Sequence, residues 1–131
     1  MTDWDRAIEL VKTRHTKSAL VSYPLSEGQS QFCALGAIGA AVLGEANWIN
    51  LGCLGGLSDR ERYLALEENP RMKAMVNRVA DAIREQYPEH GRGDWDSTRV
   101  VYRFNDSRDT TSSQLVTLFE KARIKDGEMI K

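Results

Sequence analysis

The run QFCALGAIGAAVLGEA, residues 31–46, constrains the fold more than any other stretch of the chain. It consists mostly of Ala, Gly and aliphatic residues, and we expect it to form a helix that Ser30 caps and that ends near Gly44. Gly36 and Gly39 then lie in the helix interior, where each glycine costs about 1 kcal/mol relative to alanine. Close packing of another backbone against this face would compensate for that cost.

Three further segments have apolar residues at the spacing of one helical face. The first begins at Thr2, the second at Asn69-Pro70 and the third at Thr111, and each start has residue types that cap helices. A capping box at residues 58–61 predicts another helix start. The apolar residues on the three faces are Trp4, Ala7, Ile8 and Val11; Met72, Met75, Val76, Val79, Ile83 and Tyr87; and Leu115, Leu118, Phe119 and Ala122.

The strongest strand signal is RVVYRF, residues 99–104, which is rich in β-branched and aromatic residues. We expect it to pair with residues 19–23, and we interpret residues 47–57 as a packed loop. The sequence therefore predicts an α+β fold. It would be a mainly helical single domain over residues 1–131, with about five helices and a small two- to three-stranded sheet. Residues 125–131 are expected to form a frayed tail.

Charge is balanced along the chain, since 18 basic and 19 acidic side chains give a formal net charge of −1. Helices between Ser58 and Tyr87 could mimic a helix-turn-helix, but their charges alternate, and we therefore disfavour nucleic acid as a partner. The sequence begins without the basic-then-apolar order of a secretory leader, and no apolar run approaches the ~20 residues that cross a bilayer. We expect a soluble, cytoplasmic protein with no membrane partner.

The sequence predicts neither a metal site nor a cofactor site. Cys33, Cys53, His15 and His90 lack the close spacing of zinc ligands, and two cysteines do not make a disulfide framework. The segment LGCLGGL, residues 51–57, has neither the Gly-Lys-Ser/Thr ending of a phosphate loop nor the context of a dinucleotide site.

Cys33 is the first candidate for chemistry. With Ser30 as the cap, Cys33 would occupy the third helical position, where free amides and the helix dipole stabilise a thiolate. A nucleophilic cysteine also needs a base, and His15 and His90 are the only imidazoles in the chain. The alternative, which we favour, is that Cys33 packs as a small apolar side chain.

The tripeptide Phe104-Asn105-Asp106 is the second candidate. Asp106 or Asn105 could orient a histidine in a thiol triad. Asn and Asp also dominate turns, because their side chains bond their own backbone, and we favour that structural role. A further alternative is that Asp106 accepts bonds from the amides at the start of the Cys33 helix, which would join the two most distinctive stretches without any chemistry.

FCALGAIGAA and VVYRFNDSRDTTSSQLVTLFEKA together resemble a family of small uncharacterised proteins from actinobacteria and their phages. Members share a Cys-Ala-x-Gly-Ala helix start and a strand that ends in an aromatic-Asn-Asp before a closing amphipathic helix. The resemblance implies a source and a fold unit rather than an activity, and residues 48–95 lie outside it. The matching residues are Cys33, Ala34, Gly36, Ala37, Phe104, Asn105, Asp106, Val116 and Ala122.

Two functional hypotheses follow. The first is a non-enzymatic cytoplasmic binding protein, a phage accessory factor that acts on a host or phage protein. Its candidate binding residues are Asn105, Asp106, Trp48 and Trp95. The second is a thiol-dependent hydrolase or transferase whose candidate catalytic residues are Cys33, His90 and Asp106. The sequence leaves the oligomeric state open.

Overall fold

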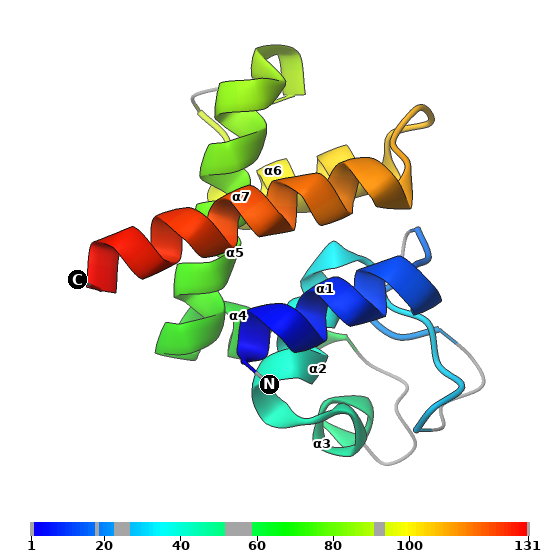
Figure 1. Cartoon of the computed structure of the whole chain (residues 1–131). Coiled ribbons are helices and arrows are strands. Elements are labelled where there is room, and N and C mark those ends of the chain that lie inside the picture. Colours follow the sequence, from blue (N-terminus) through cyan, green and yellow to red (C-terminus); the bar gives the residue numbers. More distant parts are fainter. Residues whose placement is uncertain (1, 18, 23–26, 52–58, 91–93, 131) are drawn as a thin grey trace.

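The chain folds into a bundle of α-helices (Figure 1). The structure, a computed structural model, describes residues 2–17, 19–22, 27–51, 59–90 and 94–130, with side chains up to residue 127. Within these residues there is no strand, and an isolated parallel bridge between His15 and Phe32 is the only β-type pairing. The helices are α1 (Asp3–Arg14), α2 (Ala34–Leu43), α3 (Glu45–Asn50), α4 (Arg60–Glu68), α5 (Pro70–Gln86), α6 (Ser97–Asp106), α7 (Ser112–Ile130) and the short 3-10 helix η1 (Pro88–His90).

The predicted α+β fold is wrong, because residues 99–104 lie inside α6 and residues 19–22 form no strand. The side chain of Asp96 caps α6 by accepting a 2.8 Å hydrogen bond from the amide of Arg99. The buried side chains of α6 recur at helical spacing, and together with the cap this outweighs the β propensity of the segment. These side chains are Val100, Val101, Phe104 and Asn105.

Three of the predicted helix caps are confirmed and one is wrong. Thr2, Asn69 and Thr111 accept hydrogen bonds from backbone amides at the starts of α1, α5 and α7, as predicted. Ser30 is not the cap of α2, because Cys33 occupies that position, and the helix ends at Gly44 as expected. The predicted loop at residues 47–57 is partly helical, since α3 extends to residue 50. Ser58, Leu57 and Cys53 lie outside the described residues.

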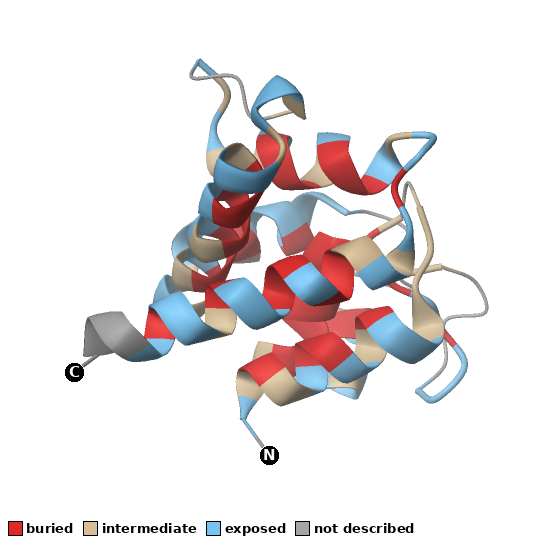
Figure 2. Ribbon diagram, turned by 45° about the horizontal axis from the view of Figure 1, so that its top comes forward, coloured by how far each residue is buried: buried red, intermediate tan, exposed pale blue. Residues whose placement is uncertain are grey.

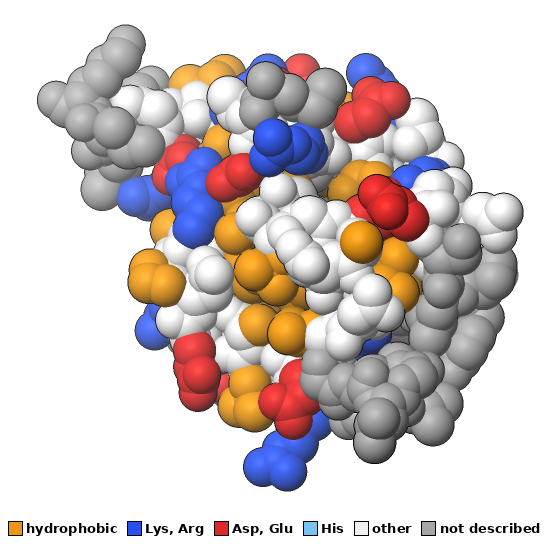
Figure 3. Space-filling view, turned by 90° about the horizontal axis from the view of Figure 1, so that it is seen from below, with side chains coloured by type: hydrophobic (Ala, Val, Ile, Leu, Met, Phe, Trp, Pro, Cys, Tyr) orange, Lys and Arg blue, Asp and Glu red, His pale blue; other side chains and the backbone are white. Residues whose placement is uncertain are grey.

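The long helix α5 contacts α2, α4, α6 and α7, so it is the common packing partner of the bundle. In Figure 1, α7 crosses in front of α5, and α1 runs below α7 and packs against both α7 and α2. Buried residues lie where these helices face one another (Figure 2). Seen from below, hydrophobic side chains are visible in the middle of the face, with acidic and basic side chains interspersed around them (Figure 3).

The glycines of α2 permit the close approach that the sequence predicts. A Cβ atom at Gly36 would lie 2.0 Å from the carbonyl oxygen of Leu20, so the backbone of Leu20 passes directly over this helix. At Gly39 the close neighbour is a side chain instead, because a Cβ atom there would lie 2.4 Å from the ring of Trp48. The indole nitrogen of Trp48 in turn donates a 3.4 Å hydrogen bond to the carbonyl of Leu20.

A buried arginine joins α3 to α4. Arg62 is 1% exposed, and its guanidinium donates to the carbonyl of Trp48 at 3.0 Å and to that of Ile49 at 2.5 Å. These carbonyls belong to the last turn of α3, where helix carbonyls lack i+4 partners and carry partial negative charge, and that of Trp48 also accepts a 3.3 Å hydrogen bond from the amide of Leu51. Asp59 supplies a carboxylate at 2.9 Å, so the buried charge is paired as well as hydrogen-bonded.

The C-terminal helix is anchored by the side chain of Asp126. Asp126 is 7% exposed and accepts hydrogen bonds from the indole of Trp4 at 2.9 Å and from Arg71 at 2.8 Å. Asp126 lies near the start of residues 125–131, the segment that we expected to fray, and the backbone of α7 continues to Ile130. Lys131 lies outside the described residues.

We predict that Gly36→Ala lowers the free energy of unfolding by about 2 kcal/mol, because the added methyl group overlaps the Leu20 carbonyl. Chemical denaturation measures the change. Gly127→Ala in α7 is the matched control, since nothing lies within 4 Å of a Cβ atom there. That substitution should stabilise the protein by up to about 1 kcal/mol through helix propensity. Equal effects at the two glycines would contradict the packing at Leu20.

Candidate functional site

The thiol of Cys33 lies at the N-terminus of α2 and is 5% exposed. Its Sγ accepts a 3.4 Å hydrogen bond from the amide of Gly36. Burial raises the pKa of the thiol from its usual 9.0 to about 12, because the loss of hydration outweighs the stabilising amides of the helix start. The thiol is therefore protonated at neutral pH, which is the opposite of what a cysteine nucleophile needs.

Asn105 forms the link that the sequence analysis expected between the two distinctive stretches. Its side chain is fully buried, and Oδ1 accepts a 2.9 Å hydrogen bond from the amide of Ala34, the first residue of α2. The same oxygen lies 2.8 Å from Nε2 of His15. Because Oδ1 already acts as an acceptor, we assign the proton of that contact to Nε2 of His15.

The amide nitrogen of Asn105 completes this arrangement. Nδ2 donates to Oδ1 of Asp106 at 3.0 Å and to the carbonyl of Thr16 at 3.4 Å. The residue that binds the start of α2 is thus Asn105 and not Asp106, the residue that the sequence analysis named. Asp106 is exposed and its carboxylate orients the Asn105 amide.

Cys33, His15 and Asn105 therefore meet around the start of α2, but their hydrogen bonds are not those of a thiol triad. A triad requires the imidazole to bond the sulfur. Among the described residues, the hydrogen bond of the Cys33 sulfur goes to Gly36, and the hydrogen bond of the His15 ring goes to Asn105. The arrangement satisfies buried polar groups, and neither histidine is hydrogen-bonded to the Cys33 sulfur among the described residues.

Asp106 also lies beside His90 and Trp95. With Glu89, Arg103 and Ser107 they line a surface hollow of about 350 Å³ between η1 and α6. The His90 ring packs edge-on against Phe104, with 5.3 Å between the ring centroids. His90, Trp95 and Asp106, three of the candidates that the sequence suggested, thus share one hollow. The other two binding candidates, Trp48 and Asn105, are fully buried.

Two exposed arginines flank Trp95. The guanidinium carbon of Arg99 lies 4.6 Å from the centroid of the Trp95 ring, and that of Arg103 lies 5.5 Å from it. The two arginines are four residues apart and so lie on one face of α6, where the half-buried indole stacks beneath them. The sequence analysis missed both arginines because it predicted a strand at residues 99–104. A strand that starts at residue 99 gives no reason for Arg99 and Arg103 to lie beside Trp95 in the preceding loop.

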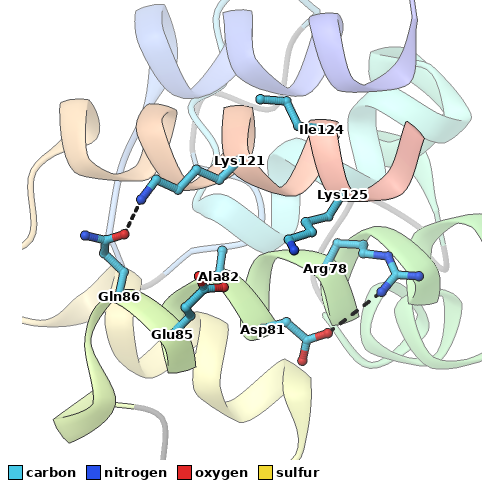
Figure 4. Close-up of a pocket in the computed structure, with 8 residues that line it drawn as sticks. All are labelled: Arg78, Asp81, Ala82, Glu85, Gln86, Lys121, Ile124 and Lys125. Atoms are coloured by element: carbon cyan, nitrogen blue, oxygen red, sulfur yellow. Dashed lines mark hydrogen bonds and ion pairs between the residues drawn. The ribbon is translucent and has the colours of Figure 1, made fainter. Parts of the chain in front are cut away.

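A second concavity, of about 590 Å³, lies between α5 and α7 (Figure 4). Its apolar part includes Ala82 and Ile124, and its charged residues come from both helices. No pattern in the sequence indicated this concavity, because Ile124 lies outside the apolar face identified at residues 115–122. The remaining lining residues are Arg78, Asp81, Glu85, Gln86, Lys121 and Lys125.

The described residues contain neither a metal-binding cluster nor a membrane-spanning helix. No group of three or more His, Cys, Asp or Glu side chains among them could hold a metal ion. None of the helices in this part of the chain is long and apolar enough to span a membrane.

Residues 3–124 match the model of a protein family described as a family of unknown function, DUF6197. The chain belongs to this family. The match extends across residues 48–95, the segment that the sequence analysis left outside its resemblance, and it includes α1 to α6 and most of α7. No curated protein and no solved structure matches the chain.

The buried thiol yields a direct test of the site in a Cys53→Ser background, where Cys33 is the single cysteine. A pKa of about 12 in place of 9.0 means about a thousandfold less thiolate at neutral pH. We predict that an electrophilic thiol probe labels the native protein far more slowly than the denatured protein at pH 7, and that the native rate still rises with pH above 9. Rapid native labelling at pH 6 to 7, with no such rise, would contradict the assignment.

Proposed function

We propose that this DUF6197 protein is a non-enzymatic, cytoplasmic binding protein that acts on another protein. The observation that carries the proposal is the use of Cys33, His15 and Asn105 in internal hydrogen bonds. Their polar atoms are bonded within the fold around the start of α2, which supports a structural role for these side chains. The buried free thiol of Cys33 is also consistent with a reducing compartment.

The surface that we propose for the partner consists of Trp95, Arg99 and Arg103, here called the Trp95 surface. Trp and Arg are the residue types most enriched where binding energy concentrates in protein interfaces. Arg99 and Arg103 are exposed, and neither forms an ion pair with a described residue. Their guanidinium groups can each bind a carboxylate in two-pronged fashion, so the partner should present acidic side chains to this surface.

We further propose that the protein is a phage accessory factor and that its partner is a host or phage protein. The resemblance at residues 33–37 and 104–106 to small actinobacterial and phage proteins supports this source. A thiol-dependent hydrolase or transferase remains the alternative, and the raised pKa of Cys33 disfavours it. Binding to nucleic acid is disfavoured by the interspersed charges visible in Figure 3 and by the net charge of −1.

The test is affinity capture from an actinobacterial lysate with the wild-type protein and with Arg99→Glu/Arg103→Glu. We expect the wild type to retain a protein that the double variant loses, because reversed charges repel acidic groups on the partner. Lys12→Glu/Lys73→Glu is the matched control, since it makes the same charge change at exposed positions on α1 and α5.

Two results would contradict the proposed binding surface. In the first, Arg99→Glu/Arg103→Glu still captures the protein that the wild type retains. In the second, Lys12→Glu/Lys73→Glu loses that protein to the same extent as Arg99→Glu/Arg103→Glu. If the protein turns over a substrate and Cys33→Ala abolishes that turnover, the non-enzymatic hypothesis is contradicted. Circular dichroism of each variant establishes that its helices are intact before capture is compared.

A further inference from the structure

The groove between α5 and α7 has walls of different charge. The wall from α5 carries Arg78, Asp81 and Glu85, and the wall from α7 carries Lys121 and Lys125. Asp81 and Glu85 are four residues apart, and so are Lys121 and Lys125. On a helix this spacing aligns both members of each pair along one side. The apolar residues Ala82 and Ile124 lie among these charges.

Some of the charges already have partners within the molecule. Nη1 of Arg78 lies 3.9 Å from Oδ2 of Asp81, and Asp81 also pairs with Arg84. Lys121 donates a hydrogen bond to the side-chain oxygen of Gln86 (Figure 4). Glu85 and Lys125 form no ion pair with any described residue. Each wall therefore keeps one charged side chain whose counter-charge lies on the opposite wall of the groove.

Ile124 is the second unusual feature of the groove. It is 60% exposed, more than any other large hydrophobic side chain whose exposure the structure describes. A single exposed isoleucine is unremarkable on a protein surface, but this one lies beside unpaired charges of both signs in a concavity. Such a surface combines an apolar centre with a polar rim, as protein interfaces do.

We propose that this groove is the twofold interface of a homodimer. A twofold axis brings the same patch of two copies together, so the patch must contain both members of every contact. The groove meets that condition, because α5 of one copy faces α7 of the other and Glu85 then meets Lys125 twice. The same operation brings Ile124 of each copy against the apolar part of its partner.

The charge of the whole chain agrees with this occupant. A net charge of −1 means that two copies repel each other only weakly at long range. A foreign partner would need its own basic group opposite Glu85, its own acidic group opposite Lys125 and an apolar centre, whereas a second copy carries all three. This proposal does not depend on the Trp95 surface, which lies on α6 and its preceding loop.

The test is sedimentation velocity over a range of protein concentration. We expect the wild type to dimerise in a concentration-dependent manner and to dissociate more readily at high salt, which screens the Glu85–Lys125 contacts. Lys125→Glu and Glu85→Lys should each weaken self-association on the order of tenfold, because each variant opposes like charges twice.

Mixing the two variants in equal amounts is the decisive step. In the mixed dimer Glu85 meets Lys125 at one contact, and the substituted residues attract each other at the second, so association should return to the wild-type level. Matched controls are Lys12→Glu and Glu9→Lys on the exposed side of α1, which should change nothing. Recovery on mixing also shows that both variants are folded.

A wild type that stays monomeric at every concentration would overturn the proposal and leave the groove to a different protein. Dimerisation that neither variant weakens, or that mixing does not restore, would place the interface elsewhere. Affinity capture of a partner protein depends on Trp95, Arg99 and Arg103, which are not part of the groove. Failure of that capture and failure of the protein to dimerise are therefore separate results.

Discussion

The buried carboxamide of Asn105 is the interaction on which the arrangement of the helices depends. Helix α2 is buried along most of its length, so the amides at its start cannot turn to water and need partners from the protein. Asn105 supplies an acceptor to the first of them, and the sulfur of Cys33 supplies a weaker one to Gly36. Through His15 and Thr16, the same carboxamide also fixes the chain that follows α1.

Those parts of the fold that depend on local signals were predictable from the sequence. The starts of α1, α5 and α7 have capping side chains, and the apolar residues behind them repeat at helical spacing within a single segment. The cost of two glycines in α2 predicted a close neighbour, and Leu20 and Trp48 fill that role. Which segment approaches the glycines depends on tertiary packing, and no local pattern specified it.

The assignment of α6 failed for a physical reason that carried over to the site. The segment is short and has β-branched and aromatic residues, so its spacing fits a helix and a strand almost equally well. A strand ending at Phe104 leaves Asn105 and Asp106 together in a turn. A helix that continues to Asp106 separates them by about 100° of rotation, which turns Asn105 into the core beside Val101 and leaves Asp106 exposed.

Residue types alone do not determine whether the Cys33 thiol is reactive. A cysteine at a helix start, with histidine and asparagine available elsewhere, matches the composition of a thiol site. Whether its pKa falls or rises depends on the balance between nearby amides and lost hydration, and burial decides that balance here. The same side chains that suggest chemistry thus act in the fold, and the surfaces that we propose for function are the Trp95 surface and the groove between α5 and α7.

A double-mutant cycle between His15 and Asn105 tests this account most directly. Denaturation of His15→Ala, Asn105→Ala and the double variant gives the coupling free energy, which should reach about 0.5 to 3 kcal/mol for side chains that share a buried hydrogen bond. The pair His15→Ala and Asn77→Ala is the control, because Asn77 is exposed on α5, and its effects should add. Additivity within about 0.3 kcal/mol for His15 and Asn105 would show that they do not act together in the folded protein, and would contradict the account.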